Sequence, residues 1–136
     1  MQKEEVEKYL NKKVEEGEIV SPVLPEGTTN YLIDIDGTIC TNTEGDYENA
    51  IPYLDRIDTI NQLYEEGNTV FFNTARGMGR YGNAAGQAYA AFYNLTVKQL
   101  NSWGVKYHKL FLGKPSGDSY IDDKGINDED FFNARD

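Results

Sequence analysis

The chain has 136 residues, one cysteine and a formal net charge of −10 at pH 7. This length predicts a single domain with one hydrophobic core, and a lone cysteine excludes an internal disulfide, in agreement with a reducing compartment. The acidic balance argues against a protein that grips nucleic acid through a broad basic surface, although a metal or a few local cations would still allow an anionic substrate.

The N-terminal arm, residues 1–29, is expected to lie outside the main domain, residues 30–136. Four apolar side chains recur at helical spacing among Glu and Lys in residues 2–16: Val6, Tyr9, Leu10 and Val14. This pattern predicts an amphipathic helix, followed by an extended, proline-containing connector over 18–30. Such an arm packs on its own domain or on a neighbouring subunit. It carries neither a signal peptide nor a membrane span, so we expect a cytoplasmic protein with no membrane partner.

The most informative stretch is residues 31–39, where a short apolar run ends in two carboxylates, a glycine and a hydroxyl. The apolar run predicts a buried central strand, and Gly37 lets the chain turn sharply after it. Asp34 and Asp36 then project together at the strand end where open α/β sheets bind ligands. Their mutual repulsion implies a hard metal such as Mg²⁺, or one protonated carboxyl. A strand-ending turn without chemistry is the plain alternative.

The next predicted elements are a polar loop over 41–49, placed to cover the strand end, and a helix over 52–66. The apolar face expected for that helix comprises Leu54, Ile57, Ile60 and Leu63 or Tyr64. A second buried strand, residues 68–74, follows and ends in the hydroxyl of Thr74.

Residues 75–82 form a glycine-rich turn that carries Arg76 and Arg80 at the same end of the predicted sheet. Guanidinium groups beside accessible backbone amides, such as that of Gly77, suit a phosphate or sugar-phosphate, so all three residues are candidates for substrate binding. Solvated charges on a mobile loop are the alternative.

Two helical pieces are expected next. Aromatic residues at helical spacing over 84–93 are typical of core or subunit contacts. Thr96 and Gln99 then match a capping box, so a new helix is expected near Val97 and ends at Gly104.

A third strand is expected over 105–113, followed by Lys114, with Lys98 as the fallback cation. A structural or solvated role is expected for His108, since no triad partner is evident, and Cys40 is expected to be a small buried hydrophobe. A fourth apolar strand starting at Ser119 ends in two further carboxylates.

Those last carboxylates are Asp122 and Asp123. Asn127 or Asp128 is then expected to cap a closing helix that Phe131 and Phe132 anchor.

In this order, the Asp-Ile-Asp-Gly-Thr segment, Thr74, Lys114 and the Asp122-Asp123 pair resemble the motifs of the haloacid dehalogenase-like (HAD) superfamily, over roughly residues 30–132. The resemblance implies that Asp34 is a nucleophile and Asp36 its general acid and base, with Thr74 and Lys114 stabilising the phosphoryl group. Mg²⁺ would be held by Asp34, the backbone carbonyl of Asp36 and Asp122, with Asp123 supporting, and Thr38 would contribute to substrate binding.

The resemblance also implies a Rossmann-like three-layer α/β sandwich with a mainly parallel central sheet. The intervals between motifs leave no room for a cap domain, so a neighbouring subunit in a homo-oligomer, the loop over 41–49 or a large substrate would close the site. The expected activity is Mg²⁺-dependent hydrolysis of a small phosphorylated substrate, in particular a sugar phosphate, as in small bacterial phosphatases of polysaccharide metabolism. Alternatives are a phosphatase of nucleotides or polynucleotide ends, a phosphotransferase, and a non-catalytic phosphate-binding module.

Overall fold

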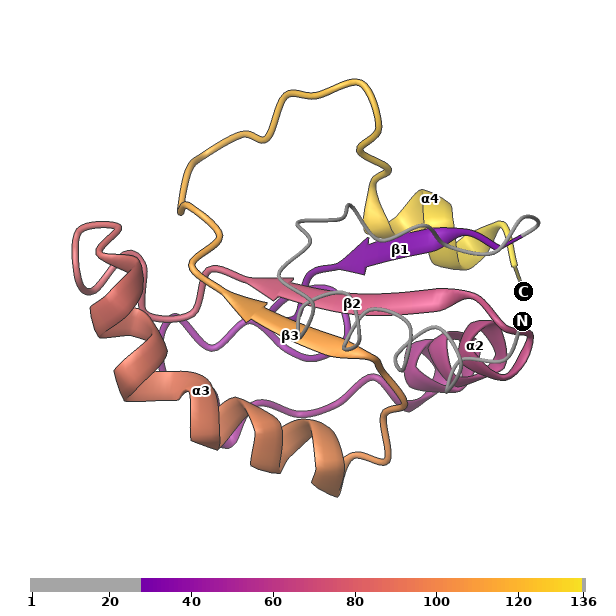
Figure 1. The fold of residues 1–136 in the computed structure, drawn as a ribbon, viewed down its shortest axis with the longest axis horizontal. Helices are drawn as coiled ribbons and strands as arrows, with labels where there is room; N and C mark the ends of the chain where they lie inside the picture. Colours follow the sequence, from indigo (N-terminus) through magenta and orange to yellow (C-terminus); the bar gives the residue numbers. More distant parts are fainter. Residues whose placement is uncertain (1–27, 136) are drawn as a thin grey trace, which may run out of the picture.

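The computed structural model describes residues 28–135, which form a small α/β unit around a parallel sheet (Figure 1). The sheet has the strand order β1 (Asn30–Ile33), β2 (Thr69–Thr74), β3 (Lys109–Leu112). The other elements are a 3-10 turn η1 (Tyr47–Asn49) and the helices α2 (Leu54–Glu65), α3 (Ala85–Ser102) and α4 (Asp128–Asn133). The predicted helix over 2–16 and nearly all of the connector lie outside the described residues.

The strand register brings three strand ends to one edge of the sheet. Ile33 of β1 is opposite Phe72 of β2, and Thr74 of β2 is opposite Leu112 of β3. All three strands are parallel, so the residues that follow them leave the sheet at the same edge. The predicted convergence of Asp34, Thr74 and the segment after β3 is therefore confirmed.

The core lies on one face of the sheet. Its buried side chains come from the strands, α2, α3 and α4, and include Ile33, Val70, Phe72, Ile57, Ile60, Leu100 and Phe132. Two right-handed crossovers that advance in the same direction across a sheet place their helices on the same side, which accounts for α2 and α3 sharing this core. The opposite face presents Leu32, Phe71 and Phe111, of which Leu32 and Phe111 are exposed.

Helix α2 follows its predicted pattern with one correction. Ile57, Ile60 and Leu63 are buried as expected, but Leu54 is exposed because it occupies the first helical position, beyond the edge of the core. Pro52 does not begin the helix, since it pairs with Cys40 in an isolated bridge.

His108 has a structural role, as predicted. Its Nδ1 accepts a hydrogen bond from the backbone of Val70, and its ring stacks on Tyr64 of α2. The histidine therefore ties the start of β3 to β2 and to the helix layer.

The predicted break before Thr96 is wrong, because α3 is continuous from Ala85 to Ser102. The Thr96 hydroxyl donates to the carbonyl of Phe92, 2.7 Å away and one turn earlier, instead of capping a new helix. The side chain of Gln99 also forms hydrogen bonds outside the helix, with Arg76 and Tyr47. Packing of both side chains against a buried group overrides the local capping signal.

The predicted fourth strand is also wrong, because residues 119–123 have no strand structure and are exposed. The carboxylate of Asp122 accepts the backbone N–H groups of Lys124 and Gly125, and these bonds lower the pKa of Asp122. This local turn competes with strand formation. Figure 1 shows the segment between β3 and α4 arching away from the sheet.

The closing helix α4 begins as expected. The side chain of Asn127 accepts the backbone N–H of Glu129, and Phe132 is buried while Phe131 packs edge-to-face on Tyr31. Within residues 28–135, no helix has the length and apolar character needed to cross a membrane.

Candidate active site

Asp34 lies at the end of β1 with donors from two segments around its carboxylate. Thr38, four residues on, donates its hydroxyl to Oδ2 at 3.2 Å, and Lys114 Nζ lies 3.7 Å from Oδ1. Gly37 makes this turn with a φ of +83°, which a residue with a side chain rarely adopts. Burial raises the pKa of Asp34, while Lys114 opposes the shift. The carboxylate therefore carries negative charge that its present partners do not fully compensate.

Thr74 and Lys114 complete the cluster from β2 and β3. The Thr74 side chain is buried and its hydroxyl accepts the backbone N–H of Arg76, while its carbonyl accepts the backbone N–H of Lys114 at 3.2 Å. The ammonium of Lys114 also lies over the ring of Tyr120. Lys114, rather than the fallback Lys98, is thus the lysine beside Asp34.

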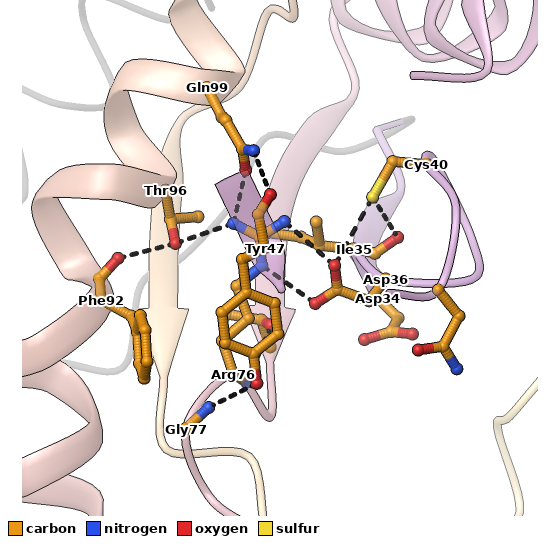
Figure 2. A network of polar contacts seen from close by, with 12 residues as sticks. Asp34, Ile35, Asp36, Cys40, Tyr47, Arg76, Gly77, Phe92, Thr96 and Gln99 are labelled. Carbon is orange, nitrogen blue, oxygen red and sulfur yellow. Dashed lines mark hydrogen bonds and ion pairs between the residues drawn. The ribbon is translucent and has the colours of Figure 1, made fainter. Parts of the chain in front are cut away.

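Arg76 is the largest of the fully buried side chains in residues 28–135, with 1% of its surface exposed. Its Nε and Nη2 donate to the two carboxylate oxygens of Asp36, at 2.9 and 3.0 Å. Figure 2 shows its remaining nitrogen, Nη1, directed at α3, where it donates to Thr96 and Gln99. Fork-to-fork pairing of this kind fixes both partners in orientation as well as in distance.

These contacts give Arg76 a role that the sequence did not predict. Four of the five guanidinium N–H groups already donate to the protein and the side chain is buried, so a substrate phosphate has little access to it. Arg76 therefore holds the carboxylate of Asp36 in place in this arrangement. Arg80 lies on the exposed side of the turn, where its guanidinium packs over the ring of Phe92.

Tyr47 brings the predicted covering loop onto this edge. Its ring lies 4.9 Å from the guanidinium carbon of Arg76, and its hydroxyl accepts the backbone N–H of Gly77 (Figure 2). Gln99 donates to the backbone carbonyl of Tyr47. Sequence reasoning missed Tyr47 and gave Gln99 a capping role. Tyr47 lies in the loop over 41–49 and Gln99 in the helix expected near Val97, but neither stretch carries a sequence signal for these contacts.

Gly77 has no room for a side chain, and its amide donates to the hydroxyl of Tyr47. A Cβ at this position would lie 2.7 Å from the Phe92 ring, and the backbone φ is +79°. We expect Gly77→Ala to lower the free energy of unfolding by about 2–4 kcal/mol, from overpacking and backbone strain together.

Chemical denaturation would measure this effect. Gly82→Ala is the matched control in the same turn, because Gly82 also has a positive φ but nothing within 4 Å of its Cβ position. It should cost only about 1 kcal/mol. Equal losses in the two variants would contradict the packing argument.

Cys40 is a buried hydrophobe, as predicted. Its Sγ lies 3.6 Å from the carbonyl of Ile35 and 3.6 Å from Oδ1 of Asp36. Burial, followed by the nearby negative charge of Asp36, raises the pKa of the thiol to about 12. The thiol is therefore protonated at neutral pH and is a poor nucleophile.

Comparison with known proteins supports the architecture. No family model and no curated protein matches the chain. A crystal structure of a structural-genomics target from Vibrio cholerae is similar, with a TM-score of 0.71 and 27% sequence identity over 77% of this chain and 88% of that one. The fold is Rossmann-like. The name of this neighbour states no activity.

The Rossmann-like edge offers oxygens that suit a hard cation. The Asp34 carboxylate is under-compensated, and among the described residues no donor contacts the backbone carbonyl of Asp36. These two oxygens fit Mg²⁺, which binds about six oxygens and keeps several waters. Residues 28–135 contain no group of three or more acidic, His or Cys side chains that could hold a metal, and the structure does not bring Asp122 or Asp123 to Asp34.

Proposed function

We propose that this chain is a Mg²⁺-dependent phosphomonoester hydrolase of the HAD-like type, acting through an aspartyl-phosphate on Asp34. The observation that carries the proposal is the pairing of Asp34 with Lys114, two groups that arrive from different strands at one sheet edge. An under-compensated carboxylate beside a lysine suits a nucleophile that must receive a negatively charged phosphoryl group.

The chemistry of the first step follows from this pairing. An oxygen of Asp34 attacks phosphorus in line, a new P–O bond forms to the carboxylate, and the bond to the leaving oxygen breaks. Lys114 and the hydroxyls of Thr38 and Thr74 stabilise charge on the phosphoryl oxygens. Fixed donors of this kind commonly supply the largest single contribution to rate.

Asp36 supplies the proton transfers. One of its oxygens first leaves Arg76 and takes up a proton from solvent, which it gives to the leaving alkoxide. The resulting carboxylate then accepts a proton from the water that attacks the aspartyl-phosphate, so that phosphate and free Asp34 are regenerated. Its two bonds to Arg76 hold the carboxylate in one orientation. Arg76 thus acts as a positioning residue in this mechanism.

The Asp34 carboxylate and the Asp36 carbonyl would hold the Mg²⁺ ion, which supplies charge neutralisation and orientation of a substrate oxygen when bound. Asp122, with Asp123 beside it, would join them only if the segment between β3 and α4 moved toward β1. That segment is exposed and has no strand structure, so few contacts oppose such a movement.

No cap domain is inserted between the proposed site residues in the part of the chain that the structure describes. Between Asp34 and Thr74 the chain forms only a loop, η1 and α2, and between Thr74 and Lys114 only a turn, α3 and β3. The covering loop packs on the turn after β2 through Tyr47 and leaves the carboxylate of Asp34 partly exposed. A small sugar phosphate or a related phosphorylated metabolite is the substrate class we propose for such a site.

Phosphate release from a panel of sugar phosphates, nucleotides and 3′-phosphorylated oligonucleotides, with Mg²⁺ and with EDTA, tests this function. We expect release that requires Mg²⁺ and favours sugar phosphates. Lys114→Ala should lower kcat by roughly 10²–10³-fold, while Lys98→Ala, a lysine-to-alanine change on the exposed surface of α3, should not alter it. Preference for nucleotides or oligonucleotides would overturn the substrate class, and Mg²⁺-independent release would overturn the mechanism.

A further inference from the structure

The sheet face opposite the helices carries an apolar strip formed by Leu32, Phe71 and Phe111. Leu32 and Phe71 are opposite each other in the register of β1 and β2, and the rings of Phe71 and Phe111 meet edge-to-face at 5.7 Å. Leu32 is 65% exposed and Phe111 46% exposed. One contiguous apolar strip therefore crosses all three strands.

Parallel sheets are almost always covered on both faces, because their crossovers and neighbouring segments bury both sides. Here α2, α3 and α4 share the core on the first face. An uncovered strip of this kind is expected to bind another apolar surface.

We propose that the second face is covered by the amphipathic helix predicted over residues 2–16 of the same chain. Its apolar stripe, Val6, Tyr9, Leu10 and Val14, supplies what the face lacks, and its remaining positions are mostly Glu and Lys, which suit the outer surface. The occupant is thus a helix with one apolar side, which would complete a three-layer arrangement.

The dimensions are compatible with this placement. A helix over 2–16 would be about 22 Å long, whereas three strands span only about 10 Å across the sheet, so the stripe can cross the whole strip. Residues 17–29 connect the helix to the start of β1 and reach roughly 45 Å when extended, which is longer than the width of the sheet. The chain enters β1 at Asn30, two residues before Leu32 on this face.

Amide hydrogen exchange in the full-length chain tests the docking. We expect the amides of residues 6–14 to be protected in the native chain and to exchange at least about tenfold faster in Phe111→Asp, while those of α2 keep their protection. Leu54→Asp is the matched control, because it places the same charge on an exposed apolar position of the opposite layer. It should leave residues 6–14 unchanged.

Other outcomes overturn the proposal. Amides over 6–14 that exchange at the rate of an unstructured peptide in the native chain would show that the segment does not dock. Sedimentation can show whether the chain forms a dimer that dissociates on dilution. If the protection of residues 6–14 were lost together with such a dimer, the face would bind a second copy of the chain. Protection that survives Phe111→Asp would place the helix elsewhere on the molecule.

Discussion

Asp34→Asn is expected to remove essentially all phosphatase activity, with kcat lowered by at least about 10³-fold on the preferred substrate. The amide nitrogen and oxygen cannot form the acyl-phosphate, so only the positioning contributed by Lys114, Thr74 and bound Mg²⁺ would remain. Single-turnover phosphate release is the measurement. An Asp34→Asn variant with native turnover would rule out the aspartyl-phosphate.

The same variant should keep its fold. Burial raises the pKa of Asp34 above its value in the unfolded chain, so ionisation of this group at neutral pH destabilises the folded state. A neutral amide removes that cost, and we therefore expect a Tm no lower than that of the native chain at pH 7. Loss of activity together with a lower Tm would point to misfolding instead of a missing nucleophile.

Arg76→Ala should give the largest loss of stability of any single change considered for this chain, about 3–5 kcal/mol. It would leave the carboxylate of Asp36 without its bidentate partner and remove the donor to the buried hydroxyl of Thr96 and to Gln99. Urea denaturation, monitored by circular dichroism, would measure the decrease in the free energy of unfolding.

Arg80→Ala is the matched control for this prediction, because Arg80 lies four residues further along the same turn but is exposed. Its removal should lower the free energy of unfolding by no more than about 1 kcal/mol, the size expected for losing an exposed contact with the Phe92 ring. If Arg76→Ala were as stable as Arg80→Ala but raised KM for the substrate, Arg76 would be a substrate contact, as the sequence first indicated.

The sequence predicted what depends on short-range patterns. Strand ends at Asp34 and Thr74 and the lysine after β3 follow from apolar runs that stop at polar residues, and the structure brings these three together. The cap at Asn127 rests on the same kind of local signal.

The errors arise where a local signal competed with a distant partner. Thr96 and Gln99 match a capping box, but the buried guanidinium of Arg76 recruits both side chains and α3 runs on. A lone arginine after Thr74 gives no sign that its partner is Asp36, 40 residues earlier. Conversely, the Tyr120-Ile121 pair was too short a pattern to outweigh the turn that Asp122 makes with its own backbone.

The buried guanidinium of Arg76 also has a consequence for how the chain folds. Its partners, Asp36, Gln99 and, through the ring contact, Tyr47, come from segments far apart in sequence, so the cluster has no local precursor. Loop-closure entropy must be overcome before such contacts stabilise the chain, which makes them late and slow to form. The proposed catalytic edge should therefore assemble only when α3 docks, and the proposed phosphatase activity should return during refolding with the final kinetic phase.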